Sequence, residues 1–397
     1  MRIEPHPRRT NLEHMPPGSF RHFVMHLTGR MAPGRAGVPV AAGRWRNAHV
    51  TVVVLVVACS GGKPYTIAVV LDAAGIEGAQ LAADRINASG GIHGHPLELR
   101  IETGAEKSAR MSLATAARLS ADKTVLAVVG HTNSASSLTA SQVYNAREVV
   151  QLSPTTSSPL YSEAGPYSFR MVPSDIEQGA FLVAQALEAG AHARVAIVFV
   201  NSDYGRPLHA VVTNSFRRVG VSPVFDAPFD VIDSSAGKAL LASLVRAEPQ
   251  VMIWIGRSAD LLPIASRLRA ALPRLAIVAS DAFSRRLPVD STRHVFDAVH
   301  YVRFVDVQRP DSVLQRLRAS HVRAHGAEIS DQMLLAYDAV SLLGAALRVV
   351  GPRREAIRAW LDDVGSAGHP FTGVTGPVEF SRRRERASGY VMVPAAR

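Results

Sequence analysis

Hydroxyl side chains follow two neighbouring apolar segments, in turns where they could bind an anion. Ser134 stands shortly after the apolar run 125–130, at the predicted start of a helix. Thr155 and Ser157 follow the run 149–153. If both runs are parallel strands of one sheet, the two turns emerge at the same edge of that sheet. Backbone N–H groups at a helix start and neutral hydroxyl donors can hold a small anion there, so the pattern predicts a small-molecule site.

Both turns also have an ordinary structural explanation. Serine is a favoured N-cap residue, so Ser134 could cap its helix whether or not a ligand is bound. Thr155 and Ser157 follow Pro154 and could be plain turn residues. The sequence alone leaves these alternatives open.

The composition is that of a globular protein long enough for two domains. The chain has 397 residues, of which 47% are apolar and 19% are charged, as in folded domains with sizeable cores. Its formal net charge is +11, but residues 1–58 contain eight Arg and two Glu, so +6 of that charge precedes Cys59. The remaining +5 is scattered rather than clustered with aromatic residues, which argues against a nucleic-acid partner.

The N-terminal region contains a segment typical of a secretory signal. Residues 49–58 form one apolar run, with Arg44 and Arg46 upstream and Cys59 directly after it. The run is short for a bilayer-spanning helix. It resembles a bacterial lipoprotein signal, in which the following cysteine is lipidated. Cys59 is the only cysteine in the chain and cannot form an intramolecular disulfide. We interpret 1–58 as an extension plus signal and 59–64 as a tether; the alternative is a buried strand that ends in an incidental cysteine.

Strand-like and helix-like segments alternate from Tyr65 onward. Near-continuous apolar runs suit parallel strands that are covered on both faces, and the segments between them have apolar residues at helical spacing. The expected strands are 66–71, 97–102, 125–130, 149–153, 194–200, 223–229, 251–256 and 275–280, with a closing pair at 376–381 and 389–394. The expected helices are 76–88, 109–121, 135–147, 177–189, 206–219, 236–248, 259–272, 310–325, 331–350 and 354–364. Repeated β-α-β alternation predicts two doubly wound α/β lobes.

The chain from Tyr65 to Pro394 resembles the type I periplasmic solute-binding proteins of the branched-chain amino acid class, which are leucine-binding-protein-like and feed ABC transporters. The resemblance implies two Rossmann-like lobes joined by a three-crossover hinge that close over a ligand. We expect lobe 1 to comprise 65–173 and 302–375, and lobe 2 to comprise 174–301 and 376–397. The segments that carry it are GAQLAADRINASGGIHGHPLELRIE at 78–102, GHTNS at 130–134, SPTTSSPLY at 153–161, YSFRMVPSD at 167–175, NSDYG at 201–205, AYDAV at 336–340 and GPVEF at 376–380.

The resemblance also assigns roles to side chains. It places Ser134, Thr155 and Ser157 on the carboxylate of an amino acid ligand, Asp281 on the ammonium, and Tyr204 at the aromatic position that helps to close the site. A carboxylate suits an ammonium because charge-assisted hydrogen bonds are roughly twice as strong as neutral ones. Tyr204 could instead be a turn residue or an interlobe contact, and Asp281 could cap the next helix.

Two departures from the family pattern bear on the ligand. The loop after the first strand is much shortened, with Leu71 running almost directly into a helix, so we expect a more open cleft; Asp72 could enter the site or face solvent. Arg257 stands where an aromatic residue is usual. If it faces the cleft, its planar guanidinium favours a carboxylate, sulfonate or phosphate on the ligand. If it points to water, it does not affect which ligand is preferred. The sequence therefore does not choose among leucine, isoleucine and valine.

The sequence offers little support for an enzyme. No nucleotide-binding fingerprint follows a predicted strand, and no His or Cys cluster was found with metal-ligand spacing. Ser134 has no identifiable base nearby in sequence. We therefore expect neither a cofactor nor a metal site.

We predict an extracytoplasmic solute-binding lipoprotein of the periplasm or cell envelope, anchored to the membrane through Cys59. It would act as a monomer, capture an amino acid or an amino-acid-like small molecule between its lobes, and deliver it to an ABC transporter permease, with no nucleic-acid partner. The alternative is a sensory or envelope-interaction protein on the same fold, with altered or lost ligand binding.

Overall fold

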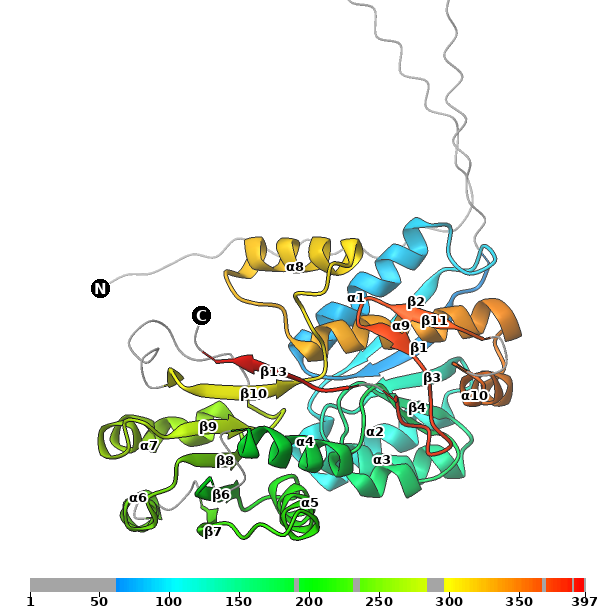
Figure 1. The fold of residues 1–397 in the computed structure, drawn as a ribbon. Coiled ribbons are helices and arrows are strands. Elements are labelled where there is room, and N and C mark those ends of the chain that lie inside the picture. Colours follow the sequence, from blue (N-terminus) through cyan, green and yellow to red (C-terminus); the bar gives the residue numbers. More distant parts are fainter. Residues whose placement is uncertain are drawn as a thin grey trace, which may run out of the picture. The chain divides into compact units, whose positions relative to one another are not determined.

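The computed structural model describes residues 62–188, 193–230, 236–283, 296–365, 369–387 and 389–395. The predicted signal segment and Cys59 lie outside these ranges. Helices and strands alternate along most of the described chain and build two main sheets (Figure 1). The expected α/β fold with two doubly wound lobes is confirmed.

The first sheet is entirely parallel, as its near-continuous apolar strands predict. Alternate residues of its strands face two different cores, with Ile67 and Val69 in one cluster and Ala68 and Val70 in the other. The strand order is β2(Leu97–Glu102), β1(Tyr65–Val70), β3(Val125–Gly130), β4(Val150–Ser153) and β5(Ser168–Arg170). Helices α1(Ala73–Ala88), α9(Asp331–Val350) and α10(Arg354–Asp362) cover one face, and α2(Ala109–Ala121) and α3(Ser134–Ala146) cover the other. Short 3-10 helices occupy Ala105–Lys107 and Pro159–Glu163.

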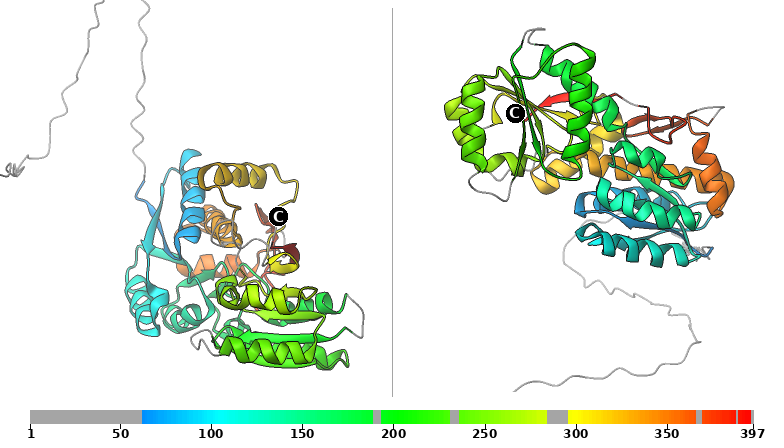
Figure 2. Two further views of the ribbon diagram at one scale, coloured as in Figure 1. Left: turned by 90° about the vertical axis from the view of Figure 1, so that its left-hand side faces the viewer. Right: turned by 90° about the horizontal axis from the view of Figure 1, so that it is seen from below.

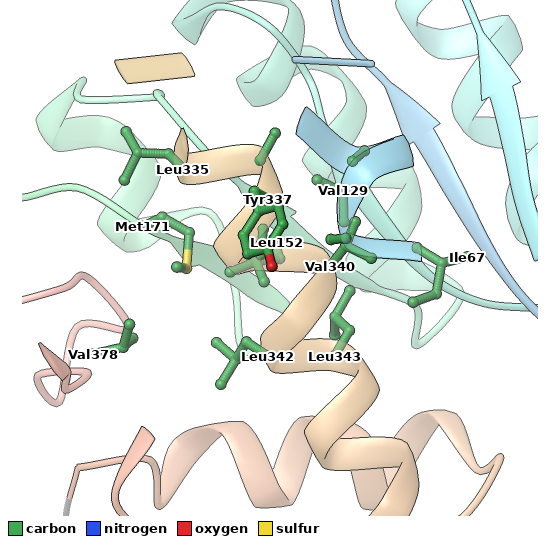
Figure 3. Packing of buried hydrophobic residues seen from close by; sticks show 14 of the residues in the cluster. Ile67, Val129, Leu152, Met171, Leu335, Tyr337, Val340, Leu342, Leu343 and Val378 are labelled. Carbon is green, nitrogen blue, oxygen red and sulfur yellow. The ribbon is translucent and has the colours of Figure 1, made fainter. Parts of the chain in front are cut away.

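Helix α9 is the central core helix of the first lobe. The helix has 20 residues, and an 18-residue window within it has a mean hydropathy of 1.7, enough by length and composition to cross a membrane. However, most of its side chains are buried inside the protein, among them Val340 and Leu343, which lie near Ile67 and Val129 of the sheet (Figure 3). An all-round apolar helix is expected at such a buried position, so its hydrophobicity is explained by packing.

The second sheet has six strands, in the order β13(Val391–Pro394), β10(Val299–Arg303), β9(Ala276–Ala279), β8(Val251–Ile255), β6(Val195–Val200) and β7(Phe225–Phe229). All neighbours are parallel except β13, which runs antiparallel to β10 at the edge. Helices α6(Ala236–Ala247) and α7(Ser258–Ala271) pack on one face, and α4(Asp175–Leu187) and α5(Gly205–Arg218) on the other. The right-hand view of Figure 2 shows this sheet between its two helix layers.

The chain passes between the two sheets three times. It leaves the first sheet after β5, returns after β10 to α8(Ser312–His325) and α9, and reaches the second sheet again at β13. A separate hairpin of β11(Phe371–Gly373) and β12(Gly376–Val378) precedes the last passage. The expected closing pair at 376–381 and 389–394 is therefore corrected: β12 pairs with β11, whereas β13 pairs with β10. Val378 and Phe380 belong to the first-lobe core. The expected lobe boundary at Gly376 is therefore corrected, because the chain still packs against lobe 1 after this residue, as far as Phe380.

Candidate functional site

The first hydroxyl turn lies between β3 and α3, at the carboxyl edge of the first sheet. Helix α3 begins at Ser134, and its N-cap is Asn133, whose side chain accepts a hydrogen bond from Ser136 N at 2.9 Å. The alternative that Ser134 caps this helix is therefore wrong. Ser134 is only 8% exposed, and its Oγ accepts a hydrogen bond from Ser158 N at 3.4 Å. Among the contacts described for this part of the chain, none uses the hydroxyl hydrogen of Ser134, so it is placed to donate to a ligand.

The second turn follows β4 and packs against the first. The hydroxyl of Thr155 donates to the backbone oxygen of Thr132 at 3.0 Å. Ser157 is 1% exposed, and its backbone oxygen accepts a hydrogen bond from Asp175 N at 2.8 Å. The Ser157 side chain is also close enough to the Asp175 carboxyl group to oppose the rise of its pKa. The Thr155 hydroxyl is thus engaged within the protein and the Ser157 side chain faces Asp175, which leaves Ser134 as the stronger candidate for a ligand donor.

An aromatic hydroxyl and a carboxylate meet at the edge of the second sheet. Tyr204 directly precedes α5, and Asp281 follows β9. The Tyr204 hydroxyl donates to Oδ1 of Asp281 at 2.5 Å, and the backbone N–H of Asp281 donates to Oε1 of Gln178 at 3.0 Å. Residues 284–295 lie outside the described chain, so the prediction that Asp281 could cap a following helix stays open.

The carboxyl groups here are held in a low-dielectric environment. Burial raises the pKa of Asp281, and the charge of Asp331 adds to that rise, while hydrogen bonds from Tyr204 and Gln178 oppose it. Burial and the charge of Asp281 also raise the pKa of Asp175. Such shifts mean that the ionised carboxylates lack enough nearby positive charge. A cationic ligand group would supply what is missing.

All six ligand-binding residues predicted from the sequence line one cavity. Its volume is about 1810 Å³, larger than the roughly 300–1,000 Å³ usual for small-molecule pockets, so one small ligand would fill only part of it. The lining includes Ser134, Thr155 and Ser157 from the first lobe, and Tyr204, Arg257 and Asp281 from the second.

Asp72 and Arg257, the residues of the two departures from the family pattern, have different environments. Asp72 also lines the cavity, but its carboxylate caps α1 by accepting a hydrogen bond from Gly75 N at 3.1 Å. Arg257 directly precedes α7, is exposed, and donates its backbone N–H to Oδ2 of Asp260 at 3.0 Å. Among the described interactions, none engages its guanidinium group. Asp72 therefore has a structural role, whereas the cation of Arg257 is available on the cavity wall.

Several residues that contact the predicted site residues or line the cavity were not predicted from the sequence. Gln178 and Asp175 are buried residues of α4 that contact Asp281 and Ser157, respectively. In the sequence, nothing near them distinguishes them from other polar residues of a helix. Arg303 and Asp331 also line the cavity. They form an ion pair, with Nε of Arg303 at 2.8 Å from Oδ1 of Asp331, which joins β10 to the start of α9.

A cluster of potential metal ligands was missed as well. Glu77 of α1 and His321 and His325 of α8 bring one carboxylate oxygen and two imidazole nitrogens within 4.8 Å of one another. No metal site was expected from the sequence. The two histidines are in fact one helical turn apart, and that was the available signal.

Comparison with known proteins supports the same family. A model of the periplasmic binding protein family matches residues 67–394. An "amino acid binding protein" of Pseudomonas aeruginosa is 25% identical over 79% of this chain and 83% of its own length. A "Leu/Ile/Val-binding protein homolog 1" of Brucella abortus is 24% identical over 80% and 84%.

Solved structures share the fold. The ABC transporter substrate-binding protein of Desulfitobacterium hafniense, determined in complex with Leu, aligns with a TM-score of 0.70 and 24% identity over 83% of this chain and 97% of that one. At this level of identity the match shows a common architecture. The two-lobe arrangement described above is therefore that of substrate-binding proteins.

Proposed function

This chain belongs to the periplasmic binding protein family, and we propose that it captures an amino acid or an amino-acid-like molecule and delivers it to an ABC transporter permease. One observation carries the proposal: hydroxyl turns at a helix start in one lobe and a carboxylate in the other line the same cavity. Relatives whose names describe amino acid binding support it. The protein would bind and release this ligand unchanged, without enzymatic action.

The proposed binding mode uses opposite polarity on the two sides of the cavity. The ligand carboxylate would accept a hydrogen bond from the Ser134 hydroxyl and face the start of α3, whose dipole adds about 0.3–1 kcal/mol. Thr155 and Ser157 would shape this side, because the Thr155 hydroxyl donates to Thr132 and the Ser157 side chain faces Asp175. The ligand ammonium would bind Asp281, with Tyr204 holding that carboxylate in place.

Arg257 narrows the proposed ligand class. Its exposed guanidinium lies on the cavity wall beside the second-lobe residues. A planar guanidinium binds carboxylate or phosphate oxygens in pairs. We therefore propose that the preferred ligand carries an anionic group besides its α-carboxylate, in contrast to leucine, isoleucine or valine.

The proposed location is the periplasm or cell envelope, with the chain anchored by a lipid on Cys59. The apolar run 49–58 directly before the single cysteine supports this. Metabolic labelling with a radioactive fatty acid should label the wild-type chain in membranes and leave Cys59→Ser unlabelled. Equal labelling of both would remove the lipid anchor from the proposal.

The sensory or envelope-interaction alternative rests on the shortened first loop, since Asp72 caps α1 directly after β1. Mass spectrometry of the small molecules that copurify with the protein separates the two functions. Transport predicts an amino-acid-like compound bound to the wild type and lost from Asp281→Ala. Absence of any bound compound, together with no binding across an amino acid panel, would favour the alternative.

A further inference from the structure

Three side chains converge where α1 meets α8, and they form a set that is typical of transition-metal sites. Oε1 of Glu77 lies 3.3 Å from Nδ1 of His321 and 3.1 Å from Nε2 of His325. The two imidazole rings lie 4.5 Å apart between centroids. The contact joins two helices that lie far apart in the sequence (Figure 1). Two imidazole nitrogens and one carboxylate oxygen therefore lie within 4.8 Å of one another.

We propose that Glu77, His321 and His325 bind a divalent transition cation of the zinc class. Zinc binds His nitrogen and carboxylate oxygen at about 2.0–2.2 Å with tetrahedral geometry, which places neighbouring ligand atoms roughly 3.3 Å apart. The two carboxylate-to-imidazole separations match this edge length. Imidazole and carboxylate ligands also suit Cu²⁺, Ni²⁺ and Co²⁺.

The two helices that carry the ligands are held in place independently of any metal. Asp311 caps α8 by accepting hydrogen bonds from Val313 N at 3.0 Å and Leu314 N at 2.8 Å. On the other helix, Gly78 lies so close to α9 that an added Cβ would stand 2.0 Å from the backbone oxygen of Met333. This close packing fixes the neighbouring Glu77. The site is therefore positioned before an ion arrives, which lowers the entropic cost of binding.

Among the described contacts, no arginine or lysine side chain pairs with the carboxylate of Glu77. Arg318 stands one turn before His321, but it is engaged with Glu328 through two hydrogen bonds of 2.8 and 2.7 Å. Among the described residues, the hydrogen-bond partners of the Glu77 carboxylate are the two imidazoles. No arginine or lysine within those described contacts competes for it.

The cluster has both a buried end and an accessible one. The side chain of His321 is 6% exposed, whereas those of His325 and Glu77 are 49% and 34% exposed. Both histidines line the large cavity. An ion can therefore enter from solvent, and three protein ligands leave a coordination position open for water, as in open zinc sites.

The test is calorimetric titration of the full, chelator-treated chain with ZnCl₂, followed by visible absorption spectra with CoCl₂. We expect one site that His325→Ala and Glu77→Gln each weaken at least about tenfold, with loss of the cobalt absorption bands. Zinc should also raise the thermal unfolding midpoint of the wild type, because a ligand bound only by the folded state stabilises it. Both substitutions should abolish that rise.

The matched control is His209→Ala, which removes another histidine that contacts a carboxylate, Asp226, at 2.8 Å. Residues 1–58 contain five further histidines, so any binding there persists in every variant and is subtracted. Zinc affinity that is unchanged in His325→Ala and Glu77→Gln, or an absence of zinc binding above that background, would overturn the proposal and leave a hydrogen-bonded cluster only.

Discussion

The hydroxyl of Tyr204 lies 2.5 Å from Oδ1 of Asp281, and both side chains line the cavity whose opposite wall carries Ser134. The two residues are 77 positions apart in the chain and meet because each follows a strand of the same parallel sheet. The hydrogen bond fixes the orientation of the carboxylate. Asp281 is thereby presented to the cavity with one oxygen engaged and the other able to accept from a ligand.

Replacing Asp281 with Asn should sharply weaken binding of an amino acid ligand. The substitution keeps the shape and removes the charge, and a hydrogen bond to a charged group contributes about 1.5–3 kcal/mol. Calorimetry should therefore show a loss of at least about tenfold. Tyr204→Phe, which removes only a neutral donor, should cost about 0.5–1.5 kcal/mol. Equal affinities for the wild type and Asp281→Asn would exclude Asp281 from the site.

Ser134→Ala should weaken ligand binding by about 1–3 kcal/mol, because a buried ligand carboxylate oxygen would lose its donor. The matched control is Thr139→Ala on the same helix, whose hydroxyl donates to the backbone oxygen of Ala135 at 2.9 Å. That variant should bind as the wild type does. Comparable losses in the two variants would point to a general effect on α3 rather than a lost ligand contact.

Ligand binding should release protons at mildly acidic pH. Burial raises the pKa of Asp281 above its ordinary value of 3.8, so part of the population is protonated between 3.8 and the raised value. An ammonium pairs only with the ionised form, so affinity should increase with pH across that window and then level off. Calorimetry in two buffers of different ionisation enthalpy measures the protons released. Affinity that falls as pH rises through this window has the wrong sign for the proposed contact.

Arg257→Ala should reduce affinity for ligands with an additional anionic group by at least about tenfold, as expected for loss of a charged hydrogen bond. Affinity for leucine, isoleucine and valine should stay within about twofold. Arg257→Lys should be intermediate, because an ammonium lacks the paired donors of guanidinium. A uniform change for every ligand in the panel would show that Arg257 does not select the ligand.

Most of the architecture could be predicted because the strands are apolar on both faces. Nine predicted strands appear within two residues of their expected bounds. Eight of them lie in parallel ladders, and covered parallel strands give a strong local signal. The strands β5, β10 and β11 were not among the expected strands. β5 and β11 have three residues each, too few for a periodic pattern, and they form through pairing with neighbours that are already in place.

The candidate site residues were likewise predictable only where they follow a recognisable strand. Ser134, Thr155 and Ser157 could be placed together because they follow neighbouring strands. In contrast, Glu77 and His321 are 244 positions apart and meet through helix packing that the sequence does not encode locally. The spacing of His321 and His325 was visible, but two histidines on one helix face are uninformative until a third ligand is found.

The central claim is that the cavity binds both charged ends of one zwitterion. Its most direct test is a calorimetric comparison of three compounds: the amino acid that binds best, the same molecule without its amino group, and the same molecule without its carboxylate. We predict that each truncated compound binds at least about tenfold more weakly to the wild type, and that Asp281→Asn causes no further loss for the compound without the amino group. If that compound binds the wild type as tightly as the amino acid does, Asp281 does not recognise an ammonium and the claim is contradicted.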